Sequence, residues 1–129
     1  MPTIFTRIIN GEIPSYKIAE DAYCYAFLDI NPNAIGHTLC VPKQEVDKLF
    51  DLDQETFLRL MEFAKRIADA LEHAVPCKRV GMAVVGLEVP HAHVHLIPIN
   101  EMHDMSFQTK VKMKEDEMIS LVEKIKSKL

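Results

Sequence analysis

Residues 90–98 read Pro-His-Ala-His-Val-His-Leu-Ile-Pro, and this stretch decides the expected architecture. Its three histidines, His91, His93 and His95, alternate with small or apolar residues. Because successive side chains of a β-strand point to opposite faces, a strand over 91–97 would place all three imidazoles on one face and leave the other for a core. Imidazoles make a poor core face, since each neutral ring has a donor and an acceptor to satisfy. The alternation therefore indicates a histidine face that carries chemistry, the alternative being a solvated strand face.

Two amphipathic patterns predict helices upstream and downstream of this strand. The first begins after Asp51 or Asp53, either of which can cap it, and stops before Pro76. Its apolar stripe consists of Phe57, Leu60, Met61, Ala64, Ile67, Ala68 and Leu71. The second helix covers about residues 114–128. Its stripe consists of Met118, Ile119, Val122 and Ile125.

Further strands are predicted on both sides of the long helix. Residues 16–30 are strand-like, and within them aromatic and smaller apolar side chains alternate over 23–28; 37–41 and 79–85 are also strand-like. Residues 4–9 fit either a short helix or an extended arm. The order of elements predicts an α+β fold, an antiparallel sheet of about five strands with one long helix and a C-terminal helix on one side. A length of 129 residues suits a single domain over 1–129, with 112–129 as a C-terminal helical extension.

Composition excludes several classes of partner. The formal net charge is −4 at pH 7, which gives no broad basic surface for duplex nucleic acid or an anionic membrane. No apolar stretch approaches the length of a membrane span, and charged residues interrupt any signal-peptide core near the start, so we expect a cytoplasmic protein. Cys24, Cys40 and Cys77 are odd in number and widely spaced, which indicates free, buried thiols in a reducing compartment.

Two kinds of chemistry suit the histidine face. One is a metal site, but Cα atoms of His91 and His95 would lie ~13 Å apart on a strand, too far for easy binding of one ion. A metal site formed by two of these histidines and completed by another residue, such as His37, remains an open alternative. The other is metal-free catalysis, in which a neutral imidazole attacks phosphorus and forms a covalent intermediate. His93 would then be the nucleophile, and His91 and His95 would orient it and contact the phosphate.

The run His91-Ala-His93-Val-His95-Leu-Ile resembles the defining motif of the histidine-triad (HIT) family. Three further blocks are similar to that family and fall in its order: the first comprises Ile4-Phe5 and Ile8–Pro14, the second is Ala26–Pro32, and the third is Gly36–Leu39 with Val41–Lys43. The blocks cover roughly the first 100 residues, and the nearest branch is that of the small Hint-like nucleotide-binding proteins.

The resemblance implies a role for each matching position. His93 matches the nucleophile, His91 and His95 its supporting histidines, and Asp29 the carboxylate that binds the ribose hydroxyls. The slot for the base is matched by Ile4, Phe5, Ile8, Ile13, Phe27, Leu28 and Ile30. Without the resemblance, the apolar set would be ordinary core and Asp29 a turn cap.

The segment before the triad departs from the family pattern. Gly86 matches an expected glycine, but Leu87 stands where Gln is common, and no Asn occupies the matching strand end. The backbone N–H groups of Leu87 and Glu88 are expected to meet the phosphate instead. Regular pleating would turn the Glu88 side chain away from the histidine face, whereas an irregular backbone would bring it to the leaving group. Thr3 and Thr6 stand where some relatives have a zinc-binding CxxC, so we expect no metal and no cofactor. His37 is then expected to support the triad by hydrogen bonding rather than to bind zinc.

The sequence thus predicts an enzyme of the HIT type that hydrolyses purine nucleoside monophosphate derivatives at the α-phosphorus, preferably phosphoramidates. Two alternatives stay open: a dinucleoside polyphosphate hydrolase, and a nucleotide-binding or scaffold protein with little turnover. The branch also implies a homodimer.

Overall fold

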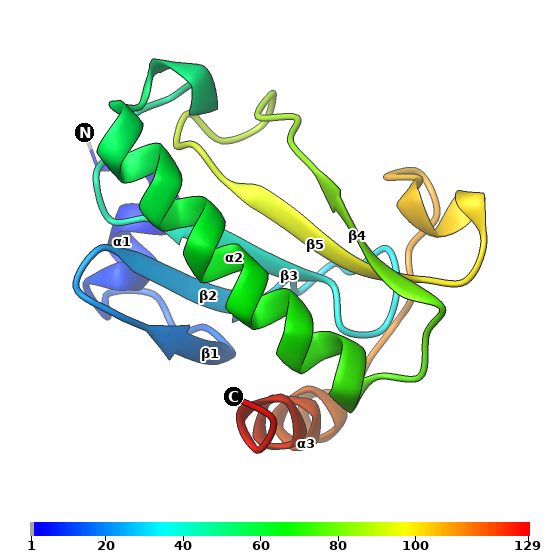
Figure 1. The fold of residues 1–129 in the computed structure, drawn as a ribbon. Helices are drawn as coiled ribbons and strands as arrows, with labels where there is room; N and C mark the ends of the chain where they lie inside the picture. The colour runs from blue at the N-terminus through cyan, green and yellow to red at the C-terminus, as the bar shows by residue number, and fades with distance from the viewer. Residues whose placement is uncertain (1) are drawn as a thin grey trace.

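The computed structural model, which describes residues 2–129, contains a five-stranded antiparallel sheet in the order β1-β2-β3-β5-β4 (Figure 1). The strands are β1 (Lys17–Glu20), β2 (Cys24–Leu28), β3 (Thr38–Pro42), β4 (Arg79–Ala83) and β5 (Val94–Ile99). The helices are α1 (Ile4–Ile9), α2 (Gln54–Ala74) and α3 (Glu115–Lys126), with short 3-10 turns η1 (Leu49–Asp51) and η2 (Met102–Met105). The predicted α+β class is confirmed.

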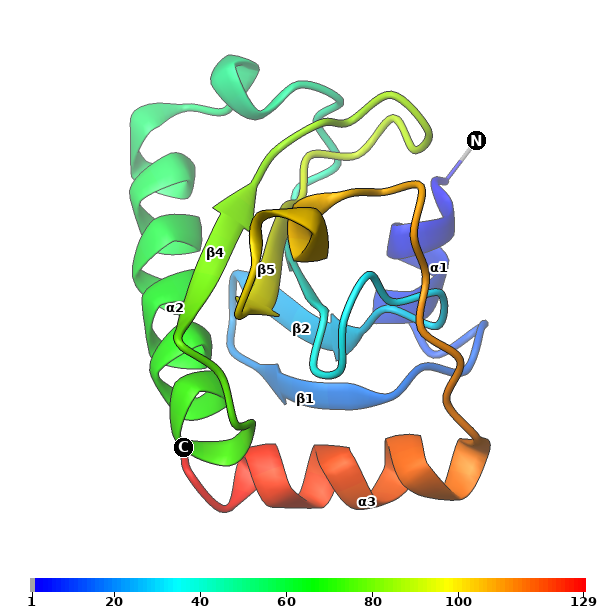
Figure 2. The same cartoon turned by 90° about the vertical axis from the view of Figure 1, so that its right-hand side faces the viewer.

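The sheet separates two apolar clusters. The larger lies under α2 and α3, and the smaller lies on the opposite face, where α1 covers it (Figure 2). The predicted alternation in β2 explains this division, because Cys24, Ala26 and Leu28 face α2 whereas Tyr25 and Phe27 face α1. The face under α1 is the one on which the site lies.

The long helix begins and ends close to the predicted positions. Asp53 is its N-cap and accepts a hydrogen bond from the Thr56 N–H at 3.3 Å. The predicted stripe is incomplete, because Phe63, Ala70 and Ala74 are also buried. In α3 the predicted stripe is wrong at Ile119, which is 51% exposed.

Three strand predictions need correction. The predicted strand over 16–30 is two strands, separated by a turn in which the Asp21 carboxylate accepts hydrogen bonds from two backbone N–H groups. The strand predicted to reach Val85 ends at Ala83. Most importantly, β5 begins only at Val94, so His91 and His93 precede the strand in an irregular segment.

Cys24 and Cys40 are buried as expected, whereas Cys77 is partly exposed, and all three are free thiols. Within residues 2–129, no helix is long and apolar enough to cross a membrane.

Candidate active site

A cavity of about 450 Å³ opens on the α1 side of the sheet. Its wall is formed by α1, the end of β2, β3, the irregular segment between β4 and β5, the start of β5 and the segment after η2. The lining residues are Phe5, Asp29, Asn31, Leu39, Val85, Gly86, Leu87, Glu88, Val89, His93, His95, Phe107 and Lys110. Seven of the predicted site residues are therefore brought together here: Phe5, Asp29, Gly86, Leu87, Glu88, His93 and His95.

The predicted apolar slot divides into three groups. Ile8, Ile13 and Phe27 pack beside Phe5 in the cluster under α1, behind the cavity wall. Leu28 does not belong to the slot, because strand alternation directs it into the opposite core, where it is 1% exposed. Ile4 and Ile30 are 48% and 79% exposed and do not line the cavity, so their contact with a base stays a prediction.

The ring of His93 is oriented by a hydrogen bond to the backbone. Its Nδ1 lies 2.7 Å from the carbonyl oxygen of His91, and a carbonyl only accepts, so Nδ1 carries the proton. In the neutral ring, Nε2 therefore holds a lone pair, and Nε2 has no hydrogen-bond partner within the described residues. The ring edges of Phe5 and His95 pack around it, each with a centroid separation of 5.0 Å. His93 thus offers an oriented, unprotonated nitrogen in a residue that lines the cavity.

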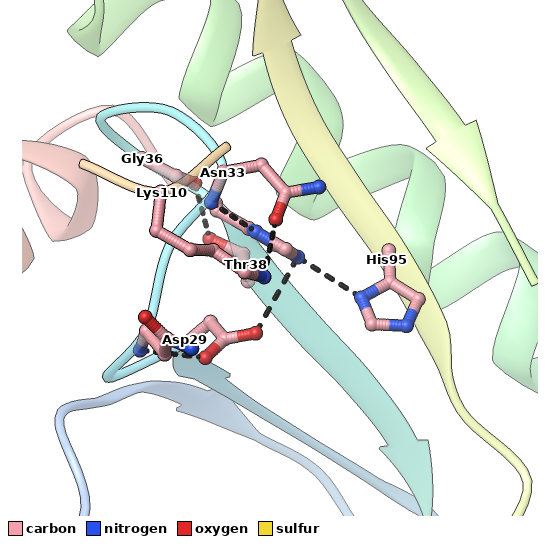
Figure 3. Close-up of polar contacts among 8 residues, drawn as sticks. Asp29, Asn33, Gly36, Thr38, His95 and Lys110 are labelled. Carbon is pink, nitrogen blue, oxygen red and sulfur yellow. Dashed lines mark hydrogen bonds and ion pairs between the residues drawn. The ribbon is translucent and has the colours of Figure 1, made fainter. Parts of the chain in front are cut away.

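A hydrogen-bonded chain fixes the tautomer of His95. The backbone N–H of Asn33 donates to Nδ1 of His37 at 2.9 Å, so the proton of neutral His37 resides on Nε2. That N–H donates to Nδ1 of His95 at 2.9 Å (Figure 3), which leaves the proton of His95 on its Nε2. His95 is therefore a donor on the cavity side, and His37 buttresses it, as expected.

Burial keeps both members of this chain neutral. Burial, reinforced by the neighbouring imidazole and by Lys110, lowers the pKa of His37 to about 3. Burial, together with the neighbouring His93 imidazole and the ammonium of Lys110, lowers the pKa of His95 to about 4. The donor–acceptor directions along the chain therefore hold at neutral pH.

His91 has a different environment from the other two triad histidines. Its side chain is fully buried, its Nε2 donates to the carbonyl of Pro42 at 2.8 Å, and its Nδ1 lies 2.7 Å from the hydroxyl of Thr3. Burial lowers the pKa of His91. Both ring nitrogens are occupied and the residue does not line the cavity, so the predicted contact of His91 with phosphate is wrong.

Asp29 caps a turn, and its position leaves the predicted ribose-binding role open. One carboxylate oxygen accepts a hydrogen bond from the Asn31 N–H at 2.8 Å, which caps the turn after β2. The other lies 3.6 Å from Nε2 of His37, and the residue lines the cavity. Burial raises the pKa of this carboxyl group. Its position at one end of the cavity suits a pair of hydroxyl donors.

Asp29, His37 and His95 also form a compact group, with ligand-type atoms within 4.8 Å of one another. The donor set does not fit a metal. The Asn33 N–H occupies Nδ1 of His37, so the Nε2 that faces the group bears a proton and has no lone pair to share. The group is a hydrogen-bond chain.

The segment between β4 and β5 explains why Glu88 lies at the cavity. Gly86 has a φ of +76°, in the left-handed region that favours glycine, and the chain is irregular from Val84 to His93. Regular pleating is lost there, so Glu88 lines the cavity, and it has no ion-pair partner within residues 2–129. The irregular backbone considered for this segment is observed, and Glu88 lines the cavity while its side chain stays exposed, so its contact with a leaving group remains a prediction.

Two cavity residues that the sequence reasoning missed come from the segment that runs from η2 to α3 across the α1 face (Figure 2). The ring of Phe107 packs edge-on against His95, with centroids 4.8 Å apart. The ammonium of Lys110 donates to the Asn33 side-chain oxygen at 2.6 Å (Figure 3). Residues 106–114 show no periodicity that could have placed them here. Leu39, by contrast, follows from alternation along β3, where it shares a face with Val41.

The sheet, the cavity and the oriented imidazoles define a small α+β protein with a histidine-based active site. The HIT domain family model matches residues 10–102, which is more than half of the chain, and the chain therefore belongs to the HIT family.

Relatives and solved structures agree with this assignment. A HIT-like protein of Borreliella burgdorferi is 40% identical over 102 residues, covering 74% of this chain and 73% of the relative. The adenosine 5′-monophosphoramidase of Saccharomyces cerevisiae is 44% identical over 96 residues, covering 74% of this chain but only 61% of the yeast protein. The crystal structure of a HIT-like protein from Bartonella henselae superposes with a TM-score of 0.86 at 30% identity, covering 98% of this chain and 96% of that one.

Proposed function

We propose that this protein is a HIT-type nucleotide hydrolase that cleaves purine nucleoside 5′-monophosphate derivatives at the α-phosphorus, with phosphoramidates as its preferred substrates and a nucleotidyl group on His93 as the intermediate. The observation that carries the proposal is the tautomer of His93. Its Nδ1–H is held by the His91 carbonyl at 2.7 Å, and its Nε2 lone pair is free for attack.

His95 supplies the complementary donor. Its Nε2–H is set by the chain through His37, so it can stabilise negative charge on the phosphoryl oxygens as the bond to His93 forms. The irregular segment around Gly86 and Leu87 borders the same cavity and offers backbone N–H groups to these oxygens.

The rest of the cavity matches a nucleoside. Its volume of about 450 Å³ is in the range of small-molecule sites. Phe5, Leu39 and Val89 provide apolar surface for a purine base, and Asp29 provides acceptor oxygens for a ribose diol.

The reaction proceeds in two displacements. In the first, the His93 Nε2–P bond forms as the P–N bond to the amine breaks, and the amine leaves with a proton that water supplies. In the second, the hydroxyl group of that water bonds to phosphorus and the bond to His93 breaks. One water is consumed, its proton ending on the amine and its hydroxyl group on the nucleoside monophosphate.

The similarity to the yeast adenosine 5′-monophosphoramidase supports the phosphoramidate as substrate. Lys110 favours a second candidate, the cleavage of dinucleoside polyphosphates, because its ammonium lies at the cavity with a neutral amide as partner and can attract additional phosphates. A binding protein with little turnover would not need the oriented nucleophile.

Steady-state kinetics test the proposal. Purified protein is assayed with an adenosine 5′-phosphoramidate, a guanosine 5′-phosphoramidate and a dinucleoside tetraphosphate, and nucleoside monophosphate is quantified. We expect the highest kcat/KM for a phosphoramidate, and His93→Ala to lose turnover while still binding AMP. His73→Ala, which removes an exposed histidine of α2, is the matched control. Turnover by His93→Ala at more than a few per cent of the wild-type rate would contradict the assignment.

The homodimer implied by the family branch also stays a proposal. The mass of the protein in solution, measured by light scattering during size-exclusion chromatography, tests it directly: twice the mass of one chain is expected, and a single-chain mass would overturn it.

A further inference from the structure

The amino-terminal helix is tied to the triad by side chains that do not line the cavity. The hydroxyl of Thr3 lies 2.7 Å from Nδ1 of His91. One oxygen of the Glu45 carboxylate accepts two hydrogen bonds, from the Thr3 N–H at 2.8 Å and from the Thr6 hydroxyl at 2.7 Å. Glu45 lies between β3 and α2, so these contacts join three segments that are distant in sequence.

The direction of each proton in this group is determined. Glu45 accepts only, so the Thr6 hydroxyl donates to it. The Thr3 oxygen accepts the Thr6 N–H at 3.1 Å, and its own proton is directed to Nδ1 of His91, because Nε2 of that ring donates to the Pro42 carbonyl. His91 is thereby held in a single tautomer and a single orientation.

The position of His91 bears on His93, because the His91 carbonyl accepts the His93 Nδ1–H. The same segment is held by a hydrogen bond from the Ala92 N–H to the Val46 carbonyl at 2.7 Å, one residue beyond Glu45. Phe5, in the first turn of α1, packs edge-on against the rings of both His91 and His93.

We propose that Thr3, Thr6 and Glu45 form a positioning lock that holds His91 and, through the His91 carbonyl, keeps Nε2 of His93 aligned for attack. The inference deepens the proposed function and rests on His93 as nucleophile. The three residues touch no reacting atom and act only through His91. A six-residue helix such as α1 has little stability of its own, so the lock also keeps Phe5 in the cavity wall.

Two pairs of variants separate positioning from general stability. Thr3→Val removes the hydroxyl at nearly constant shape, and Thr3→Ser restores it. Glu45→Ala removes the shared acceptor, and Glu45→Gln retains an acceptor oxygen without the charge. Glu55→Ala, which removes an exposed carboxylate paired with Arg59 on α2, is the matched control.

Kinetics with an adenosine 5′-phosphoramidate give the first readout. Misplacement of a reacting group by a fraction of an ångström to 1 Å reduces rate rather than binding, so we expect Thr3→Val to lower kcat about tenfold to a hundredfold with KM nearly unchanged. Glu45→Ala should lower kcat less, because the Thr3 hydroxyl is retained. Thr3→Ser and Glu45→Gln should recover most of the loss.

Histidine ring 15N NMR gives a readout that needs no turnover. In Thr3→Val, the Nδ1 signal of His91 should move as it loses its donor, and the Nδ1–H signal of His93 should broaden or shift as well. If wild type shows no hydrolysis but these signals change as described, the lock stands and the proposed function fails. If wild type is active and Thr3→Val leaves kcat and the His93 signals unchanged, the lock is overturned. A loss of activity that Thr3→Ser does not recover would also overturn it.

Discussion

The two ends of the triad contain the same residue type in opposite environments. His91 is completely buried, and protein atoms occupy both of its ring nitrogens. His95 lines the cavity, and among residues 2–129 only one of its ring nitrogens has a hydrogen-bond partner, His37. Regular alternation would have made them equivalent neighbours of His93. In the structure, His91 is a buried support and His95 is a donor that faces the cavity.

The largest expected effect comes from comparing the two outer histidines directly. His95→Ala removes a preorganised donor, and we expect kcat to fall by about 10²–10³ while the protein stays folded. His91→Ala leaves a cavity and unpaired polar groups in the interior, so it should lower the free energy of unfolding by about 2–5 kcal/mol. Urea titrations and kcat measured on both variants test the contrast. If His91→Ala and His95→Ala lose the same stability and the same kcat, the two outer histidines do not have different roles.

The His37–His95 pair should make the protein sensitive to acid. Both folded-state pKa values, about 3 and about 4, lie below the ordinary value of 6.5. At pH values between the folded-state and the unfolded-state pKa, these two histidines bind more protons in the unfolded chain than in the folded one. Their contribution to the free energy of unfolding is therefore complete above pH 6.5 and is lost as the pH falls, at up to about 1.4 kcal/mol per pH unit for each group.

Replacing His37 tests this linkage. His37→Gln should reduce the decrease in the free energy of unfolding between pH 6.5 and pH 4, whereas the exposed-site variant His73→Gln should retain the wild-type slope. Denaturant titrations at pH 7, 5.5 and 4 provide the measurement, and an unchanged slope in His37→Gln would contradict the assignment of a neutral chain.

Asp29 lines the cavity near His95, and its contribution to nucleotide binding should depend on whether the ligand has ribose hydroxyls. Asp29→Ala should weaken binding of a ribonucleotide by about 1–3 kcal/mol, the usual scale for hydrogen bonds to a charged group, and of a 2′,3′-dideoxy analogue much less. Calorimetric titration with AMP and with dideoxy-AMP compares the two. Equal losses would mean that the turn cap is the only role of this carboxylate.

The smallest expected effect concerns Glu88, which borders the cavity without an ion-pair partner in the described chain. A carboxylate there should attract a cationic amine leaving group, more strongly at low salt. Glu88→Gln should reduce kcat/KM for a lysine-type phosphoramidate a few-fold, which is typical of an exposed charge pair, and leave a neutral-amine substrate unaffected. If the ratio of kcat/KM for the two substrates changes neither with the mutation nor with salt, Glu88 has no role in recognising the leaving group.

The resemblance to the family supplied most of the predicted residues that line the cavity, and strand alternation would have corrected part of that set. Phe27 and Leu28 were both assigned to the base slot by resemblance, yet neighbouring strand residues face opposite sides, and only Phe27 packs beside Phe5. Applying the period of two to β2 and β3 would have excluded Leu28 and included Leu39. The sheet, the long helix and its Asp53 cap follow from local pattern.

Other features depend on tertiary contacts that no local pattern encodes. His91 leaves the cavity because the segment before Val94 is bent and held by hydrogen bonds to Pro42 and Val46, which lie more than 40 residues away in sequence. Lys110 reaches the cavity only because the chain crosses the α1 face on its way to α3 (Figure 2). The partners that fix the tautomers of His91 and His95 are likewise distant in sequence, whereas Asn33, which fixes that of His37, is four residues away.

The central claim is that Nε2 of His93 bonds covalently to the α-phosphorus. Rapid acid-free quenching of wild-type protein with an adenosine 5′-phosphoramidate, followed by intact mass and peptide mapping, tests it most directly. We expect a transient adduct of one adenylyl group on His93, which disappears as AMP forms and is missing in His93→Ala. Full turnover without any adduct on the reaction time scale, or an adduct that maps to another residue, would contradict it.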